Sequence, residues 1–470
     1  DAIAEYPPDG GVAKKLLQQA WKEKLGVADT DYEVIMVVNA DYNTKLNAMM
    51  SGGDVPDYFE INIEDLPNLV KNDIIAPVDD VVSLMPAYQK LLDNTANKMS
   101  YDNFAVNGVH YAFTQATLDG SLNGPGVKGL IMRTDWLKNL NLKTPTTLDE
   151  LHDVLLAFTK DDPDGNGKDD TYGLGGDKNG MFSSLFGAYG IFLNGIDSWI
   201  EVDGKLVHST TVPQVKDVLK VLNQWYAEGI IDPDKFVVEE KQSKDKFIAG
   251  QIGAYENSVW AANDARVAWS ETQPDASCAF VTPPTGPDGE SGFPVNPIVT
   301  LGRVISKNCI ENKDIERFAK ILNFSCDTGE DGGMMMVTYG EEGKQYTYDK
   351  STDVVTQLVS DNTELYKLGF SNPVRWETVI DRRWIPQGDL RGVDFQISND
   401  TNNWLISEFS GSVQAMKDYP DLYNKLWNEY FTKIVTGVLP VSAYDEYVEK
   451  FYEQGGTELT GQVNEAWAAD

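Results

Sequence analysis

The sequence predicts an α/β protein made of two lobes, and three observations support this fold class. The chain has 470 residues, whereas single hydrophobic cores stop growing near ~250–300 residues. Hydrophobic residues make up 41% of the chain and charged residues 24%, which is ordinary for a globular protein. Strand-like and helix-like segments alternate over the first half, and this alternation favours mostly parallel sheets flanked by helices.

The first predicted elements lie between residues 32 and 62. Tyr32–Val38 (YEVIMVV) is rich in β-branched residues and is expected to form a buried strand. Asn43 is expected to cap a short helix that stops at Gly52 and Gly53 and that has Leu46, Met49 and Met50 as its apolar face. Asp57–Ile61 (DYFEI) is expected to form the next strand.

Two later helices each begin with a predicted capping box, in which a threonine precedes Glu or Gln by three residues. Thr147 and Glu150 open the segment LDELHDVLLAF, and Thr211 and Gln214 open the second helix. His152 lies off the apolar stripe of the first helix, so we expect a solvated side chain and not a ligand. The residues expected to be buried are Leu151, Leu155 and Phe158 in the first helix and Val215, Val218, Leu222 and Trp225 in the second, which stops at Gly229.

The charge balance argues against nucleic acid as a partner. The 39 basic and 73 acidic side chains give a formal net charge of −34, and an acidic surface repels phosphate backbones. The carboxylates are dispersed along the chain, as they are when acidity serves solubility. No run of about 18 apolar residues occurs, so the sequence predicts no membrane-spanning helix.

The cysteines predict neither a zinc site nor a complete disulfide framework. Cys278, Cys309 and Cys326 lack zinc-ligand spacing, and their odd number leaves at least one thiol outside any disulfide within the chain. A pair between Cys309 and Cys326 stays open, because a sequence does not fix the geometry that a disulfide needs. Residues 283–297 (PPTGPDGESGFPVNP) are expected to form a surface loop or a crossover.

The stretch DPDGNGKDDTYG, from Asp162 to Gly173, has the oxygen-bearing residues of a calcium loop. The residues that match the start of an EF-hand loop are Asp162, Asp164, Asn166, Gly167 at the sharp turn, Lys168 through its carbonyl, and Asp170. Gly173 stands where a calcium sensor has a bidentate glutamate, so we expect a structural brace and not a calcium switch. An Asp-Gly or Asn-Gly turn that binds no metal is the alternative.

Five segments spread along the chain are more specific together than any one motif. They are DYNTKLNAMMSGGDVPDYFEIN (41–62), MRTDWLKNLNLKTPTTLDELHDVLLAFTKDDPDGNGKDDTYGL (132–174), GKLVHSTTVPQVKDVLKVLNQWYAEGIIDPDKF (204–236), FIAGQIGAYENSVW (247–260) and KIVTGVLPVSAYDEYVEKFYEQGG (433–456). In this order they resemble the extracellular solute-binding proteins of bacterial ABC importers. More narrowly, they resemble the large lipoprotein-type oligosaccharide binders of family 1.

The resemblance implies a two-lobed, periplasmic-binding-protein-like (Venus flytrap) fold with several hinge crossings. It places residues 1–114 and 298–365 in the first lobe, and residues 115–297 and 366–470 in the second. It also implies a monomeric lipoprotein on the outer face of the cytoplasmic membrane of a Gram-positive bacterium, which delivers a carbohydrate to membrane permease subunits. A structural Ca²⁺ is implied in the second lobe, held by Asp162, Asp164, Asn166, Lys168, Asp170 and Thr171. Thr171 is a departure, because the family commonly has an acidic residue at its position.

Residues that follow predicted strands are the candidates for ligand contact, because ligands of open α/β sheets bind beyond the carboxyl ends of strands. Glu60 and Asn62 end the segment DYFEIN, Gln115 follows VHYAFT, and Asn257 and Trp260 follow IGAYE. A flat indole covers the apolar face of a sugar and leaves the hydroxyls free for polar partners, so Trp260 is the leading candidate. In the family that the chain resembles, the tryptophan after this strand stacks on the sugar.

A stretch without a clear helical face supplies further candidates. Trp376, Trp384 and Trp404 lie there, and Arg375 beside them is expected to donate hydrogen bonds to the ligand. Most other aromatic residues are expected in the core.

Two other classes of function are alternatives to a sugar-binding protein. A glycosidase needs only two carboxylates set ~5–9.5 Å apart, but the sequence has no G-x-S-x-G, H-E-x-x-H or Gly-Lys-Ser/Thr motif, so we expect binding without catalysis. A binder of peptides or of acidic (uronate) oligosaccharides is the nearer alternative. Uronate binding stays open because Arg375, Arg382 and Arg383 lie beside Trp376 and Trp384.

Overall fold

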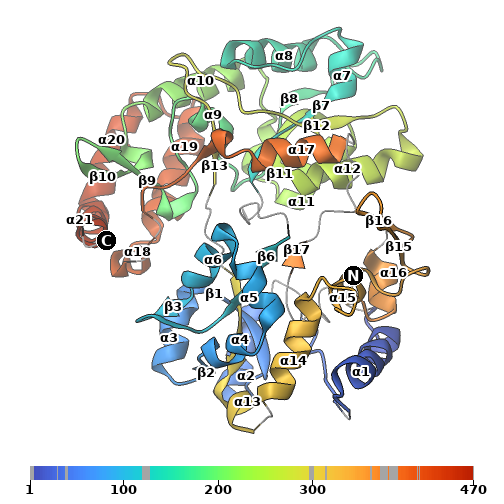
Figure 1. The fold of residues 1–470 in the computed structure, drawn as a ribbon. Coiled ribbons are helices and arrows are strands. Elements are labelled where there is room, and N and C mark those ends of the chain that lie inside the picture. The colour runs from blue at the N-terminus through green and yellow to red at the C-terminus, as the bar shows by residue number, and fades with distance from the viewer. Residues whose placement is uncertain are drawn as a thin grey trace. The chain divides into compact units, whose positions relative to one another are not determined.

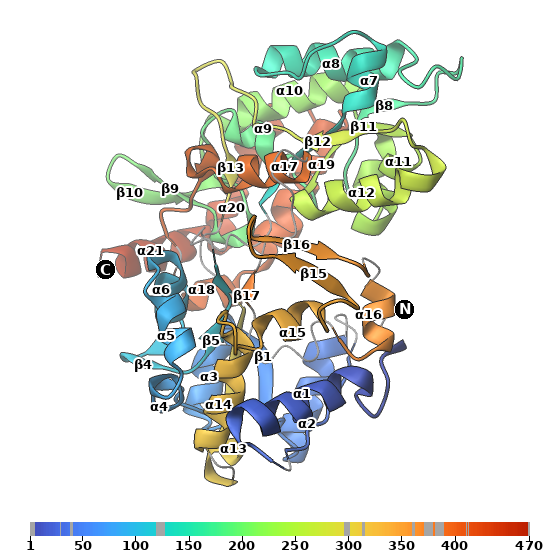
Figure 2. The ribbon, with the colours of Figure 1, turned by 45° about the vertical axis from the view of Figure 1, so that its right-hand side comes forward.

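The computed structural model divides the chain into two compact units. The residues it describes are 5–28, 30–37, 41–118, 127–295, 301–312, 315–359, 362–370, 379–380, 390–409, 411 and 413–468. The first unit comprises Asp1–Asn123 and Ile298–Gln387, and the second comprises Gly124–Pro297 and Gly388–Asp470. Figures 1 and 2 label the elements of each unit.

Two boundaries between the units lie later in the chain than the sequence analysis placed them. Residues 115–123 and 366–387 belong to the first unit and not to the second. Local pairing explains the difference, because β6 (Ala116–Thr117) pairs in parallel with β17 (Val379–Ile380). The Asn97 side chain also donates to the carbonyl of Thr117 at 3.1 Å, which holds β6 against helix α6 (Thr95–Asp102) of the first unit.

The first unit alternates short helices and strands. Its remaining helices are α1 (Gly11–Leu25), α2 (Tyr42–Gly52), α3 (Leu66–Lys71), α4 (Asp79–Ser83), α5 (Pro86–Leu92), α13 (Lys307–Asn312), α14 (Ile315–Cys326), α15 (Met334–Tyr339) and α16 (Asn362–Lys367). Its remaining strands are β1 (Tyr58–Asn62), β2 (Ile75–Ala76), β3 (Ala105–Val106), β4 (Val109–His110), β5 (Phe113–Thr114), β14 (Leu301–Ser306), β15 (Tyr346–Asp349) and β16 (Val354–Gln357).

The central strand of the main sheet in this unit is β14. It pairs antiparallel with β1 along one edge and with β2 and β5 along the other. β1 and β5 therefore run in the same direction, and their carboxyl ends lie at the same edge of the sheet. One face of the sheet packs on α4, α5 and α14 around Tyr88 and Ile305, and the other packs around Phe104 and Leu69.

The predicted strand at Tyr32–Val38 is wrong for the residues that are described. Residues 32–37 form no strand, although alternate side chains from Tyr32 to Met36 are partly buried. Tyr32 packs on Trp21 of α1, with ring centroids 5.6 Å apart. The alternating burial of these side chains therefore results from packing of one side of the segment on α1 and α14. It does not result from hydrogen-bonded pairing with another strand.

The elements that follow agree better with the sequence. α2 begins after Asp41 and not after Asn43, and it ends before Gly53, which adopts the left-handed conformation (φ 79°) as predicted. Leu46 and Met50 are only partly buried against the core under β1. β1 lies within one residue of the predicted strand.

The second unit has a four-stranded sheet covered on both faces. Its helices are α7 (Thr134–Asn139), α8 (Leu148–Lys160), α9 (Ser183–Gly187), α10 (Val215–Ala227), α11 (Glu240–Ile248), α12 (Val259–Thr272), α17 (Leu390–Asn399), α18 (Gln414–Asp418), α19 (Asn428–Val435), α20 (Ala443–Phe451) and α21 (Thr457–Trp467). Its strands are β7 (Lys128–Arg133), β8 (Tyr172–Leu174), β9 (Trp199–Val202), β10 (Lys205–His208), β11 (Ile252–Ser258), β12 (Cys278–Phe280), β13 (Phe293–Pro294) and β18 (Trp404–Leu405).

The sheet order in the second unit is β12-β7-β11-β8. Leu130 and Ala254 face the large core formed with α8, α10, α19 and α20. The opposite face carries Tyr255, which packs on Phe247 of α11 at 4.6 Å between ring centroids, and Phe247 in turn packs on Trp269 of α12.

The described main sheet of the first unit is antiparallel and that of the second unit is mixed, whereas the sequence analysis expected mostly parallel sheets. β7 and β14 are antiparallel to their neighbours, and only β8 and β11 pair in parallel within these two sheets. β7 and β14 are also the first described strands after the chain passes from one unit to the other. A strand that enters a unit in this way has no preceding helical crossover to return it in the parallel direction.

The predicted helix α8 is confirmed. Two details differ from the prediction: the hydrogen bonds of its N-terminal cap and the environment of His152. Thr147 accepts from the Glu150 amide at 3.2 Å, but the Glu150 carboxylate accepts from Thr146. His152 is not solvated: its side chain is 24% exposed, and its Nε2 lies 2.7 Å from Glu228 Oε2 at the end of α10. The predicted stripe of Leu151, Leu155 and Phe158 is buried.

Helix α10 has the predicted buried face without the predicted capping box. Val215, Val218, Leu222 and Trp225 are buried. Gln214 precedes the helix without a side-chain cap, and the Thr211 hydroxyl donates to the carbonyl of His208. Gly229 follows the helix with φ 80°, as expected of a stop signal.

Two remaining expectations concern the cysteines and the Gly/Pro-rich stretch. All three cysteines are buried, and Cys309 and Cys326 are not joined by a disulfide. The stretch 283–297 is not a surface loop throughout, because Phe293 is buried in β13, which pairs with β18. Among the described residues, no helix combines the length and the apolar run needed to cross a membrane.

Candidate functional site

The sheet of the first unit brings Asn62 and Gln115 to one edge. β1 and β5 flank β14 with Ile61 and Thr114 both opposite Gly302, so Asn62 and Gln115 follow at the next step of the two strands. Asn62 is exposed and Gln115 is partly exposed. Glu60 lies on β1 two residues before Asn62, and its carboxylate is 3.6 Å from Arg303 of β14.

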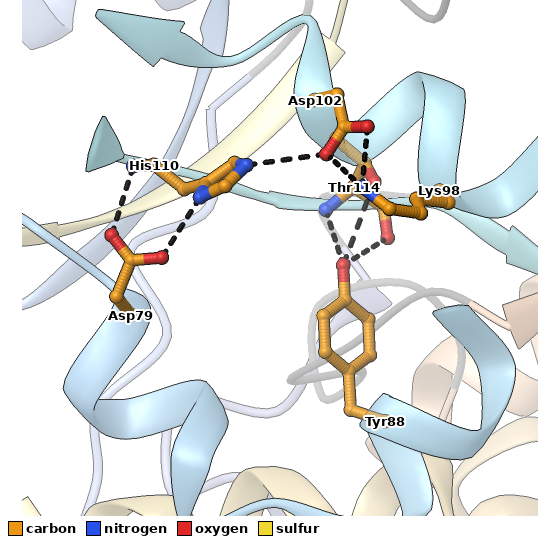
Figure 3. Close-up of polar contacts among 6 residues, drawn as sticks. All are labelled: Asp79, Tyr88, Lys98, Asp102, His110 and Thr114. Carbon is orange, nitrogen blue, oxygen red and sulfur yellow. Dashed lines mark hydrogen bonds and ion pairs between the residues drawn. The ribbon is translucent and has the colours of Figure 1, made fainter. Parts of the chain in front are cut away.

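The strand that precedes Gln115 is held by buried and partly buried polar contacts (Figure 3). The Tyr88 hydroxyl accepts from the Thr114 amide at 2.9 Å and donates to its carbonyl at 3.2 Å. His110 lies between two carboxylates, with Nδ1 2.8 Å from Asp79 Oδ1 and Nε2 3.3 Å from Asp102 Oδ1. These contacts tie β4 and β5 to α4, α5 and α6, and so fix the position of Gln115.

The corresponding edge of the second unit gathers Asn257, Glu240 and Lys128. Asn257 lies opposite Gly129 near the end of β11, and Ser258 lies opposite Lys128 at the start of β7. The Asn257 side chain is buried and donates to Glu240 Oε1 at 3.3 Å. Glu240 is the first residue of α11, and its Oε2 lies 4.0 Å from Lys128 Nζ.

Trp260 lies two residues beyond β11, in the first turn of α12. Its side chain is 43% exposed, unlike Trp225 and the other tryptophans of the core. Trp260 follows Ser258, the last residue of β11, by two residues. The structure therefore joins a large exposed aromatic surface to amide and carboxylate groups at the carboxyl end of a strand.

A buried network lies beneath this edge and fixes the loop that follows β8. Glu256 of β11 accepts from the backbone amides of Ser183 and Ser184 at 2.6 Å each. Burial raises the pKa of Glu256, and these hydrogen bonds and the charge of Lys235 oppose the rise. Burial also lowers the pKa of Lys235 to about 8, against the attraction of Asp177 and Glu256.

The loop held by this network places Lys178 beside the start of α11. Lys235 Nζ donates to the carbonyl of Gly180 at 2.5 Å and lies 4.8 Å from the ring centre of Phe236. The Lys178 amide donates to Val238, and its Nζ donates to Glu239 Oε1 at 2.5 Å. Lys178, in the loop after β8, thus lies beside Glu239 at the start of α11, and Glu240 is the first residue of that helix.

The aspartate-rich loop connects α8 to β8 and turns on Asn166. The Asp162 carboxylate accepts from the amides of Asn166 and Gly167 at 3.0 and 2.9 Å. The Asn166 side-chain amide donates to Asp164 and Asp170 at 2.8 and 3.1 Å. Gly165 and Gly167 have φ of 68° and 75°, which only glycine adopts at little cost.

The carboxylate and amide oxygens of this loop are ligands that suit a hard cation. In the structure, however, the carboxylates of Asp164 and Asp170 are bridged by hydrogen bonds from the Asn166 side-chain amide. Burial raises the pKa of Asp164, and the neighbouring Asp162 and Asp170 add to the rise against a backbone hydrogen bond from Asn166. Across the described part of the chain, no three His, Cys, Asp or Glu side chains are arranged to hold a metal. The Thr171 hydroxyl donates to the carbonyl of Phe158 at 2.8 Å, which attaches the loop to α8.

Several predicted site residues lie away from these sheet edges or are not among the residues that the structure describes. Arg375, Trp376 and Trp384 are outside the described residues. Trp404 is buried and its indole donates to the carbonyl of Ser398 at 2.9 Å, so it belongs to the core and not to a binding surface. Two pockets of about 340 and 310 Å³ lie in the first unit, and none of the predicted site residues lines them.

Sequence reasoning missed the charged residues that surround the predicted ones. Glu256 carried one signal, because it is a carboxylate at an inward position of the buried strand IGAYENS. Lys128, Lys178, Glu239 and Glu240 carried none, because exposed charges of both signs occur throughout the chain. Only the register of β7 with β11 and the loop contacts bring them together.

Comparisons with known proteins agree with this arrangement. Residues 21–307 match the family model described as bacterial extracellular solute-binding protein. The polygalacturonan/rhamnogalacturonan-binding protein YtcQ of Bacillus subtilis is 26% identical over 466 residues, which cover 96% of this chain and 88% of YtcQ. The fructooligosaccharide ABC transporter substrate-binding protein FusA of Streptococcus pneumoniae is 30% identical over 268 residues, which cover 54% of this chain and 48% of FusA.

Solved structures establish the same fold. FusA of S. pneumoniae in complex with kestose superposes with a TM-score of 0.70 at 20% identity, covering 99% of this chain and 97% of FusA. An EF-hand mutant of FusA in complex with fructo-nystose superposes with a TM-score of 0.71 at 20% identity and the same coverage. The family model alone covers more than half of the chain. The chain is therefore a member of the bacterial extracellular solute-binding protein family.

Proposed function

We propose that the chain binds an oligosaccharide and delivers it to the permease subunits of an ABC importer. The observation that carries this proposal is the exposed indole of Trp260 at the carboxyl end of β11. An indole covers the apolar C–H face of a sugar ring, and Asn257 near the end of β11 and Glu240 at the start of α11 have polar groups that suit sugar hydroxyls. Asn62, Gln115 and Glu60 offer similar groups on the first unit.

The relatives support a carbohydrate as the ligand. YtcQ is named for polygalacturonan and rhamnogalacturonan, and FusA for fructooligosaccharides. Both are sugar chains, and both proteins match this chain through the family to which it belongs. Hinge closure on the sugar is part of the proposal, and it requires that the closed form bind the sugar better than the open form. Arg375, Trp376 and Trp384 remain proposed contacts.

Calorimetric titration of the purified chain with a panel of oligosaccharides tests this function. We expect one saturable binding event for at least one sugar, and chromatography of the recovered sugar should show that it is unchanged. Unchanged sugar would separate a binding protein from a glycosidase, which needs a pair of carboxylates placed across the scissile bond. Peptides of similar size serve as the control panel, and binding to peptides alone would contradict the proposal.

A structural Ca²⁺ in the loop between α8 and β8 is a second part of the proposal. Asp162, Asp164 and Asp170 provide carboxylate oxygens, Asn166 an amide oxygen and Lys168 a carbonyl, which are the ligand types that Ca²⁺ prefers. Thr171 closes the base of the loop through its bond to α8. A bound dication would relieve the repulsion between the carboxylates, and a FusA variant described as an EF-hand mutant points to a related loop in that protein. The ion would brace the loop and take no part in sugar binding.

We further propose that the chain works outside the cell as a lipoprotein anchored to the outer face of the cytoplasmic membrane of a Gram-positive bacterium. The family is extracellular by description, and the Bacillus subtilis relative LipO is named a lipoprotein. Labelling of surface proteins with a reagent that does not cross the membrane tests the location. A chain that is labelled only after lysis would contradict it.

A further inference from the structure

We propose that carboxylates paired with Lys128, Lys178 and Arg303 make this chain select uncharged oligosaccharides over uronate oligosaccharides. The inference rests on the proposed function, and it concerns the charge of the sugar that the same site accepts. A uronate carries a carboxylate on every ring, so a site that binds it needs cations free to form charge-assisted hydrogen bonds. Lys128, Lys178 and Arg303 instead each lie within 4.0 Å of a carboxylate of the chain, and the proposed contact Arg375 lies outside the described residues.

Lys128 is the cation nearest to Trp260 along the paired strands. Its partner in register is Ser258, two residues before Trp260. Glu240 Oε2 lies 4.0 Å from its Nζ, while Glu240 Oε1 accepts from Asn257. Glu240 therefore places a negative charge beside Lys128, and a uronate carboxylate that approached Lys128 would be repelled by it.

Lys178 is neutralised in a similar way in the loop after β8. Its Nζ donates to Glu239 Oε1 at 2.5 Å, and its backbone amide donates to the carbonyl of Val238. Glu239 also stands at the start of α11, where its backbone amide donates to Gln242. The partial positive charge of a helix N-terminus adds to the stability of a carboxylate there, so Glu239 is not readily displaced by a ligand.

At the sheet edge of the first unit, a cation is again paired with a carboxylate of the chain. Arg303 of β14 lies 3.6 Å from Glu60 of β1, its cross-strand neighbour. The Tyr42 hydroxyl bonds to both the amide and the carbonyl of Glu60 at 3.0 Å, which fixes this part of β1. The formal net charge of −34 acts in the same direction, because it opposes the approach of any polyanion.

Matched sugars that differ only in charge give the most direct test. An oligogalacturonide of defined length is compared with the same oligosaccharide after reduction of its carboxyl groups to hydroxymethyl groups, and kestose is added as an uncharged sugar of another kind. Calorimetric titration at low and high salt is expected to show tighter binding of an uncharged sugar, with little dependence on salt. Tighter binding of the oligogalacturonide, weakened by added salt, would overturn the inference.

The variant Glu240→Gln tests the mechanism, because it frees Lys128 and keeps an oxygen for Asn257. It is expected to bind the oligogalacturonide about two- to fivefold more tightly than the wild-type chain, as the loss of one partly exposed charge pair allows. The result is expressed as the ratio of its affinities for the oligogalacturonide and for the reduced oligosaccharide, so a contact of residue 240 with hydroxyls that both sugars share does not alter it. Glu429→Gln is the matched control, because it frees Lys433 on the surface of α19, far along the chain from these strands.

The outcomes separate this inference from the function on which it rests. If none of the sugars binds, the proposed function fails. If sugars bind but the oligogalacturonide is preferred, the function stands and the inference fails. An unchanged preference in Glu240→Gln, equal to that of Glu429→Gln, would show that the Glu240 charge does not set the specificity.

Discussion

Trp260, the proposed sugar contact, owes its exposure to its position just after a strand. The strand β11 is buried along most of its length, and it ends only two residues before Trp260. A tryptophan in the middle of that strand would be core, whereas in the first turn of α12 it remains 43% exposed. Exposure of so large an apolar side chain costs solvation free energy, and contact with a ligand is a physical reason to retain it.

Replacing Trp260 with alanine should weaken sugar binding without unfolding the protein. We expect a loss of about 1 kcal/mol or more, or roughly a fivefold higher dissociation constant, because the stacking surface is removed. Val267→Ala is the matched control, because Val267 is also exposed on α12. Calorimetric titration measures the sugar affinity of both variants, and melting temperatures near that of wild type show that both are folded. A sugar affinity of Trp260→Ala equal to that of Val267→Ala would show that Trp260 is not part of the site.

Glu256 should matter for stability and not through contact with the sugar. Glu256→Ala leaves the amides of Ser183 and Ser184 without their acceptor, and we expect a loss of about 3 kcal/mol in the free energy of unfolding. Glu256→Gln keeps one acceptor oxygen and should lose roughly 1 kcal/mol. Urea unfolding measures both values. Equal stabilities for the two variants would contradict the role given to these hydrogen bonds.

At the scale of elements, the loop between α8 and β8 is the proposed Ca²⁺ site. If Ca²⁺ binds there, a chelator should lower the melting temperature and added Ca²⁺ should restore it, because an ion that binds only the folded chain stabilises it. Asp164→Asn should reduce this response and leave sugar affinity unchanged. No shift with chelator, together with no metal in elemental analysis, would make the loop an ordinary turn.

The contact between α8 and α10 predicts a dependence of stability on pH. Burial alone would lower the pKa of His152, but hydrogen bonds to Glu228 and Asp153 raise it above 6.5. Hydrogen bonds from Gln224 and His152 lower the pKa of Glu228 below 4.5. The histidine contribution is complete below pH 6.5 and is lost as the pH rises through its raised pKa, and the glutamate contribution is complete above pH 4.5 and is lost as the pH falls.

The stabilising effect of this contact should therefore be greatest between pH 4.5 and 6.5. The melting temperature of His152→Gln should fall below that of wild type most clearly in this window, and the difference should shrink as the pH rises above 6.5 and through the raised pKa of His152. Glu228→Gln should show the same window, and the double variant should lose little more than either single one. A difference that is constant with pH would show that the contact does not titrate.

Elements with strong local signals were predictable from the sequence, and those that depend on distant partners were not. α8 and β1 have clear caps or alternation, and both were predicted within a residue or two. Residues 32–37 have the composition of a strand, yet they pack on α1 without a pairing partner. Hydrogen-bonded pairing is a property of two segments, and the pattern of one segment does not determine it.

The same limit applies to the site and to the whole molecule. The positions after strands were predictable, because carboxyl ends of strands form ligand-binding edges. The counter-charges Glu239 and Glu240 were not, because their proximity to Lys178 and Lys128 depends on long-range register. Likewise, β7 and β14 pair antiparallel because the chain enters each unit at these strands. The local pattern of apolar residues does not show where the chain passes between units.

If one ligand contacts both units, binding should make the whole molecule more compact. X-ray scattering with saturating sugar is expected to give a smaller radius of gyration than scattering without sugar. Trp260→Ala at the same sugar concentration serves as the control, because its lower occupancy should give a smaller change. Identical profiles with and without bound sugar would contradict a closure of the units.

Calorimetric titration against a panel of oligosaccharides tests the central claim most directly. The account predicts a single saturable binding event with an uncharged oligosaccharide, a weaker event in Trp260→Ala, and complete recovery of the sugar unchanged. Absence of binding to every sugar of the panel, or hydrolysis of the sugar that binds, would contradict the claim that this chain is an oligosaccharide-binding protein of an importer.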